Sequence, residues 1–289
     1  MTTTANPPAA AVQAARRRRL RLPGPALTGL IILAVLIALA VLAPWIAPHD
    51  PEAVDPNQIL KPPSPTYLFG TDSLGRDVFS RVLFALRVSL LVAVSSVVLS
   101  ALVAVPLGAL AGYFGGWVDT VISRPLDMLL VLPALLLAVT LIAVIGPGTA
   151  VAALAIAVIY LPILARVMRG SSLAVARLGY VEGATARGAG HLRVLTGHVV
   201  PNSIGPVIVQ LSILAGFALQ IEAALSFLGL GTQPPTPSLG LMLSEGRDVL
   251  TQAPWVEIFP GLTLAIAVLS FILIGDGLRH RLDPQGVVR

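Results

Sequence analysis

The amino-acid sequence predicts an all-α membrane protein with six transmembrane helices, and three features of its composition carry that prediction. Charged residues make up only 11% of the 289 residues, whereas soluble domains carry about 25%. Hydrophobic residues reach 56%, and the mean hydropathy is +0.88. Several uncharged stretches contain the roughly 20 apolar residues that a helix needs to cross a bilayer. Together these values exclude a soluble globular fold.

The charge balance and residue usage exclude several functional classes. A net charge of +5 is compatible with nucleic-acid binding, but the basic residues form Arg clusters beside apolar runs, as the positive-inside rule describes. We therefore expect no nucleic-acid partner. The absence of cysteine excludes disulfides, a thiolate nucleophile and Cys-ligated metal centres. Because the four histidines are scattered along the chain, we expect no metal site, no catalytic residue and no cofactor in this chain.

Residues 1–26 are predicted to be a disordered and basic cytoplasmic tail, followed by a first transmembrane helix over 27–47. The tail is rich in Thr, Ala and Pro and contains arginines at 16–19 and 21. A basic block before an apolar run is also typical of a secretory signal peptide, whose apolar core has about 7–15 residues. The apolar run is longer here, which favours a retained helix.

Residues 48–87 are predicted to form an extracytoplasmic loop, because they include many prolines, charges of both signs and no long apolar run. Within this loop, Asp72, Arg76 and Asp77 are spaced closely enough to pair. We expect these three side chains to pack the loop against the helix bundle or against a partner.

Five further transmembrane helices are predicted to form a core over residues 88–275. The uncharged run 128–165 is too long for one helix, and Gly146-Pro147-Gly148 divides it with a tight turn. An inside loop over 169–202 separates the fourth and fifth spans, and residues 276–289 form a cytoplasmic tail. The expected spans, including the first, are 27–46, 88–112, 127–145, 150–168, 203–222 and 257–275.

The distribution of basic residues orients these six spans. With the N-terminus inside, the inside regions and their flanks hold 14 arginines, and the outside regions hold five basic residues, in agreement with the positive-inside rule. One span more or one fewer would place the Arg-rich C-terminal tail outside. We therefore expect a multi-pass protein of the bacterial inner membrane with both termini in the cytoplasm.

Small and polar residues within the spans are expected to be structural. Gly108 and Gly112 form a small-xxx-small pair, which lets helices approach closely in lipid. Glu222 lies at the outer end of the fifth span, where we expect it to pair with a basic residue of a neighbouring helix; contact with a substrate is the alternative. No charged residue is expected in mid-span, which argues against coupling to protons or sodium ions through a buried carboxylate.

The most informative segment is the inside loop over 180–201. Small helix-compatible residues are followed by Gly188 and Gly190, so the pattern predicts a short helix outside the membrane, a sharp turn and a second helix that enters the fifth span. A face with one acid and small side chains suits docking into the cleft of a partner. The alternative is a solvated loop.

The spacing Glu-x-Ala-x-x-x-Gly in this loop, with Pro201 thirteen residues after the glycine, resembles the EAA signature of bacterial ABC-importer permeases. The resemblance implies a type I ABC-importer permease architecture, in which a cytoplasmic coupling helix docks into the ATPase subunit. The ATPase-coupling residues that it implies in this chain are Glu182, Gly183, Ala184, Arg187 and Gly188.

The chain departs from the family signature at three positions. Gly183 stands where alanine is usual, and His198 and Val200 stand where isoleucine and leucine are usual. A glycine at position 183 should loosen the helix by about 1 kcal/mol relative to alanine, although docking can hold it.

Three further stretches resemble the dipeptide/oligopeptide/nickel permeases. They are residues 70–81, residues 226–231 with the prolines that follow, and residues 275–284. The matches run in order along most of the chain. The proline-rich loop and the long first span resemble the C-type member of the permease pair.

The resemblance implies a non-catalytic permease subunit of an ATP-driven importer of short peptides. Its implied partners are a second homologous permease, two cytoplasmic ATPase subunits that bind ATP and Mg, an extracytoplasmic solute-binding protein and the lipid bilayer. A Walker A loop needs a lysine, and the only lysine, Lys61, is followed by two prolines. We therefore expect a separate subunit to be the ATPase. The alternatives are import of nickel or another small solute, and an ion-coupled secondary transporter, for which inverted repeats and an interrupted helix are expected.

Overall fold

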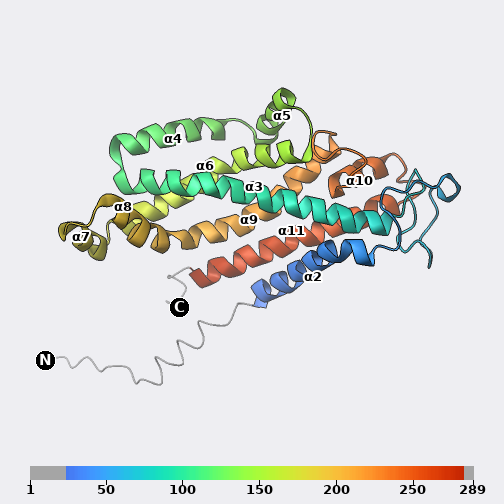
Figure 1. Cartoon of the computed structure of the whole chain (residues 1–289), viewed down its shortest axis with the longest axis horizontal. Helices are drawn as coiled ribbons and strands as arrows, with labels where there is room; N and C mark the ends of the chain where they lie inside the picture. The colour runs from blue at the N-terminus through green and yellow to red at the C-terminus, as the bar shows by residue number, and fades with distance from the viewer. Residues whose placement is uncertain (1–23, 283–289) are drawn as a thin grey trace, which may run out of the picture.

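The computed structural model describes residues 24–282, with side chains up to Arg279, as an elongated helical bundle (Figure 1). The arginines at 16–19 and parts of both predicted cytoplasmic tails lie outside the described residues. Within the described part of the chain, the regular structure is helical apart from one isolated bridge between Thr71 and Asp77. The all-α prediction is confirmed.

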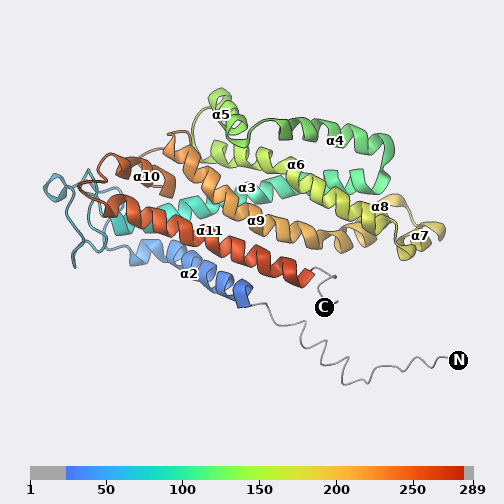
Figure 2. The same cartoon turned by 180° about the vertical axis from the view of Figure 1, so that it is seen from behind.

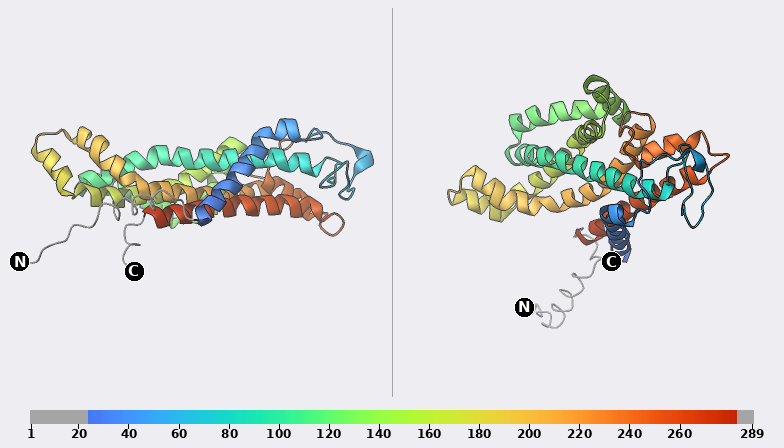
Figure 3. Two further views of the ribbon diagram at one scale, coloured as in Figure 1. Left: turned by 90° about the horizontal axis from the view of Figure 1, so that it is seen from below. Right: turned by 45° about the vertical axis from the view of Figure 1, so that its right-hand side comes forward.

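Five of the described helices are long and apolar enough to cross a membrane. They run side by side along the length of the bundle (Figures 1 and 3). In chain order they are α2 (Gly24–Ile46), α3 (Val78–Phe114), α6 (Thr149–Ala176), α9 (Val200–Phe227) and α11 (Trp255–Leu282).

The third predicted span, 127–145, is a bent pair of helices instead of one straight helix. α4 (Gly116–Val131) and α5 (Ala134–Ile145) meet at an angle of 96° and lie along one side of the bundle (Figure 2). Pro133 stands at the bend, where it lacks a backbone N–H and favours extended backbone for the preceding residue. Leu132 accordingly has φ −80° and ψ 133°. The described residues hold six candidate spans if this pair is counted as one.

The predicted boundary between the loop and the second span is ten residues too late. α3 begins at Val78, where the Asp77 side chain accepts a hydrogen bond from the backbone N–H of Ser80 and caps the helix. The sequence places residues 78–87 in the loop because Arg81 and Arg87 interrupt the apolar run. In the structure both arginines lie on the helix.

The crossing of α3 and α6 lies in the core of the bundle, and two glycines of α3 make it possible. A Cβ atom at Gly108 would lie 2.8 Å from the Cβ atom of Met168, and one at Gly112 would lie 2.8 Å from that of Ser172. Non-bonded carbon atoms do not approach so closely, so a larger residue would push the helices apart. The expected structural role of the small-xxx-small pair is confirmed.

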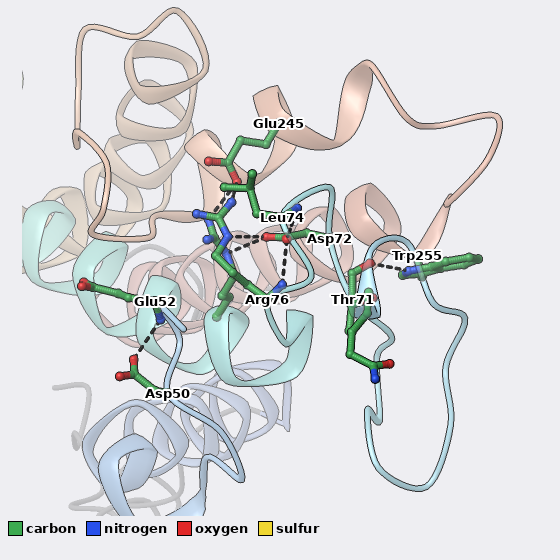
Figure 4. Close-up of polar contacts among 10 residues, drawn as sticks. Asp50, Glu52, Thr71, Asp72, Leu74, Arg76, Glu245 and Trp255 are labelled. Atoms are coloured by element: carbon green, nitrogen blue, oxygen red, sulfur yellow. Dashed lines mark hydrogen bonds and ion pairs between the residues drawn. The ribbon is translucent and has the colours of Figure 1, made fainter. Parts of the chain in front are cut away.

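A buried cluster of charges joins the loop 47–77 to the short helix α10 (Leu239–Arg247) (Figure 4). Arg76 donates to Asp72 at 2.7 Å and to Glu245 of α10 at 2.9 Å. Arg81, which is fully buried, donates to the same Glu245 carboxylate at 2.8 Å. Asp72 and Arg76 therefore pack the loop against the bundle as predicted. Asp77 does not join them, because it caps α3.

The prediction of a basic partner for Glu222 is wrong. The Glu222 side chain is buried in α9, where Ser89 of α3 donates to one carboxylate oxygen at 2.7 Å and Ser226 donates to the other at 2.8 Å. Each hydroxyl in turn accepts a backbone N–H, from Leu239 for Ser89 and from Thr232 for Ser226. Among the described residues, no ion pair involves Glu222. Hydroxyl groups satisfy this carboxylate where a cation was expected.

Candidate functional site

The candidate site is a helical hairpin at the end of the bundle opposite the loop 47–77 (Figure 1). Its first helix is α7 (Gly179–Ala186), and its second helix is α8 (His191–Val194), which continues through a π-helical turn (Leu195–Val199) into α9. The short helix, the turn and the second helix occur in the order that the sequence predicts. We call residues 179–199 the α7 hairpin.

The inner face of the α7 hairpin is apolar and packs against the chain itself. Val181 and Ala184 of α7 are buried. The second arm contributes three more buried side chains, Val194, Leu195 and Val199. Ala184 was a candidate for a docking surface of small side chains, but its burial shows that it serves the internal packing of the hairpin.

The outer face of the α7 hairpin presents charge and apolar surface together. Glu182 and Arg187 are exposed, and Gly183 between them is half-buried. Three large apolar side chains of the same segment are also exposed: Leu178, which precedes α7, by 46%, Tyr180 by 47% and Leu192 by 74%. Exposed apolar side chains next to a few charges are typical of a protein–protein contact surface.

The turn of the α7 hairpin depends on Gly188. Its φ is +83°, in the left-handed region where a side chain is strained. The backbone N–H of Gly188 donates to Thr185, and that of Ala189 donates to Ala184, so the two bonds close the end of α7. The signature glycine is therefore explained by backbone conformation.

A contact between Tyr113 and His191 fixes the hairpin to the end of α3. The Tyr113 hydroxyl lies 3.0 Å from Nδ1 of His191, and the ring of Phe114 lies 5.7 Å from the same imidazole. Sequence reasoning missed this anchor because the two partners are 78 positions apart. The only signal was a histidine and an aromatic pair, each beside a glycine turn.

A second polar feature, which we call the polar cleft, lies between α3, α4 and α6. It is a cavity of about 430 Å³ that contains two ion pairs. Arg169 of α6 donates to both carboxylate oxygens of Asp119 at 2.5 and 2.6 Å, and Arg166 donates to Asp127 at 2.7 Å. The predicted boundary between the fourth span and the inside loop falls between Arg166 and Arg169, but both arginines lie on α6. The cleft was not predicted.

The chain matches two protein-family models. Residues 104–285 match the family model of the binding-protein-dependent transport system inner membrane component. The chain belongs to this family. Residues 13–63 also match the model of the N-terminal transmembrane domain of oligopeptide transport permease C.

Curated members of the family are similar to this chain over most of their length. The glutathione transport system permease protein of Pectobacterium atrosepticum is 42% identical, over 93% of this chain and 89% of the relative. The di/tripeptide transport system permease protein of Pseudomonas aeruginosa is 42% identical, over 90% and 88%. The dipeptide transport system permease protein of Haemophilus influenzae is 40% identical, over 90% of each chain.

The fold is also found among solved structures. A chain of the MetNI methionine ABC transporter, solved in inward-facing conformations, matches with a TM-score of 0.58 at 18% identity. The match covers 70% of this chain and 97% of that chain. The predicted ABC-importer permease architecture is confirmed, and the protein is a non-catalytic, multi-pass membrane subunit of a transport system.

Proposed function

We propose that this chain is the C-type permease subunit of an ATP-driven importer of short peptides. Its relatives named for dipeptide, di/tripeptide and glutathione transport, at 40–42% identity over about nine-tenths of the chain, support the peptide substrate. The observation that carries the mechanism is the α7 hairpin, which presents Glu182 and an apolar surface at one end of a membrane bundle.

The partners follow from that assignment. A second homologous permease completes the membrane domain, two ATPase subunits bind ATP and Mg, and a solute-binding protein delivers the peptide. The arginine distribution supports an orientation with both termini and the α7 hairpin in the cytoplasm of a bacterial inner membrane. The loop 47–77 and α10, which lie at the opposite end of the bundle (Figure 1), then face outside.

The α7 hairpin couples the ATPase to the transmembrane helices. Glu182 and Arg187 bind charged groups at the rim of the ATPase cleft, Gly183 keeps the outer face flat, and Ala184 and Gly188 maintain the shape of the hairpin. Because α8 runs without a loop into α9 and His191 contacts Tyr113 of α3, a movement of α7 is passed to both helices. Nucleotide binds the two states of the ATPase with different affinity, and this difference drives alternating access.

Replacement of Glu182 tests this coupling. Glu182→Ala removes a charge-assisted contact, which contributes about 1.5–3 kcal/mol, while the apolar docking surface remains. We expect uptake of a labelled dipeptide by the whole transporter to fall more than co-purification of the ATPase subunits with the permease.

Asp248→Ala is the matched control, because Asp248 is an exposed acid at the other end of the bundle. Uptake by the Glu182→Ala transporter at the level of the control would reduce the α7 hairpin to a solvated connector. Nickel uptake in place of dipeptide uptake by the unaltered transporter would replace the peptide assignment and leave the coupling role intact.

A further inference from the structure

The polar cleft places charges on α6, which is long and apolar enough to cross a membrane, and on α4, which is so only when counted together with α5. Arg166 and Arg169 belong to α6, and Asp119 and Asp127 belong to α4. The side chains stay accessible: Arg166 is 60% exposed, Asp127 54% and Arg169 39%. Charged side chains on transmembrane segments avoid lipid and face a water-filled path or a protein interior. The cleft therefore opens to water or to the protein path, not to the acyl chains.

The two ion pairs cross the cleft from one wall to the other. Both acids belong to α4, and both paired arginines belong to α6. Arg169 holds Asp119 with two parallel hydrogen bonds, the geometry with which a guanidinium recognises any carboxylate. A ligand that carries both an ammonium and a carboxylate group can replace one of these pairs and leave neither of its members unpaired. A ligand with one sign of charge would pair with one member of the opened ion pair and leave the other member without a partner.

The size and the net charge of the cleft fit such a ligand. Its volume of about 430 Å³ falls within the range of about 300–1,000 Å³ that small-molecule sites occupy. Arg124 of α4 lines the same cavity on the wall that carries the aspartates, so the cavity holds three arginines and two aspartates. The excess positive charge favours the carboxylate end of the ligand.

We propose that the polar cleft binds the charged termini of a zwitterionic peptide during its passage through the transporter. Asp119 takes the ammonium group and Arg169 takes the carboxylate, each released from the other, while the pair of Arg166 with Asp127 stays closed. The proposal rests on the proposed peptide-importer function. The proposal adds a site in this chain that recognises the charged ends of the peptide and makes no use of the peptide's side chains.

The absence of cysteine in the chain allows a direct test by thiol labelling of the whole transporter complex in nanodiscs without phosphatidylethanolamine. Thr120 is exposed on α4 and lines the cleft, so Thr120→Cys reports its occupancy. We expect millimolar glycylglycine to slow labelling several-fold, while the same dipeptide with an acetylated N-terminus and an amidated C-terminus has no effect. Val144→Cys, 82% exposed on α5 outside the cleft, is the control whose labelling neither peptide changes.

Three substitutions connect the protection to the charges. In the Thr120→Cys background, Asp119→Asn and Arg169→Gln should abolish protection by glycylglycine, and Asp119→Glu, which keeps the charge, should retain it. Unchanged labelling without peptide and unchanged co-purification of the partner subunits show that these variants fold.

The outcomes separate the cleft from the function. Equal protection by the blocked peptide, or no protection in a complex that still imports glycylglycine, overturns the cleft proposal. Slowed labelling that appears only when phosphatidylethanolamine is present would assign the cleft to a lipid headgroup and also overturn it. Protection without import supports the cleft and removes the importer assignment.

Discussion

Two glycines of the α7 hairpin, five positions apart, are present for different reasons. Gly183 has ordinary helical backbone, and a Cβ atom there would lie 3.6 Å from Arg187 Nη1, a normal contact. Gly188 has no heavy atom near its Cβ position within the described structure, but its φ of +83° disfavours any side chain. Lack of space therefore does not prevent a larger residue at either position. The effect of a substitution is set by backbone conformation at Gly188 and by helix propensity at Gly183.

Alanine at these two positions should have opposite effects on α7. Gly183→Ala gains up to about 1 kcal/mol of helix propensity, so hydrogen exchange of the α7 amides should slow up to about fivefold. Gly188→Ala forces a side chain into the left-handed region at a cost of about 1–2 kcal/mol, so exchange should accelerate. The measurement is hydrogen–deuterium exchange on the purified complex. Faster exchange in Gly183→Ala would mean that α7 is held by contacts which the alanine disturbs.

At this scale the sequence identifies the right residues more often than the right contacts. Glu182 is exposed on the hairpin as the signature implies, but Ala184 packs inward. Glu222 was recognised as an unusual acid, yet its partner Ser89 lies 133 positions away. A pairing across helices depends on which faces meet, and hydropathy does not encode this.

The elements α3 and α4–α5 differ most from the predicted spans, and both differences have local causes. The sequence predicts that the second span starts only after the charges at Arg81 and Arg87. Arg81 is nevertheless tolerated inside α3, because Glu245 neutralises it. The bend at Pro133 is absent from the prediction because the uncharged run is divided there only at Gly146-Pro147-Gly148, although a proline inside an apolar run also signals a break. The positions of α2, α6, α9 and α11 follow from their long apolar runs, which hydropathy detects well.

The α3–α6 crossing gives a prediction at the element scale. Gly112→Ala places a methyl group against Ser172 and the neighbouring backbone, and overpacking of this kind costs about 1–3 kcal/mol. We expect a lower thermal unfolding midpoint for the detergent-purified complex. Gly170→Ala on α6 is the matched control, because a Cβ atom there meets nothing within 4 Å; its midpoint should stay the same or rise. A Gly112→Ala midpoint equal to that of the control would show that the helices separate without cost.

For the whole molecule, the two ends of the bundle have different compositions. One end carries the loop 47–77 and α10, closed by the charge cluster of Arg76, Arg81 and Glu245. The other carries the α7 hairpin (Figure 1). Composition and the order of apolar runs predict this arrangement, because connections between spans alternate sides. The polar cleft was not predictable, since it depends on how α4 folds back beside α6.

The orientation of the bundle is testable with single cysteines in the naturally cysteine-free chain. Ser64 and Tyr180 are both exposed and lie at opposite ends. In intact spheroplasts, a membrane-impermeant maleimide should label Ser64→Cys and leave Tyr180→Cys unmodified until the membrane is opened. The reverse pattern would invert the proposed topology and place the α7 hairpin away from any cytoplasmic ATPase.

The unbroken path from α8 through the π-helical turn into α9 makes this segment a lever. It spans 37 residues, His191–Phe227, which at 1.5 Å per residue is about 55 Å. A rod of that length that tilts by about 5° around one end moves its other end by about 5 Å. The far end of α9 carries Glu222 and Ser226, whose hydrogen bonds reach the segment leading to α10. A small rotation of the α7 hairpin is therefore enlarged along the rod into a displacement of several ångströms at the opposite membrane surface.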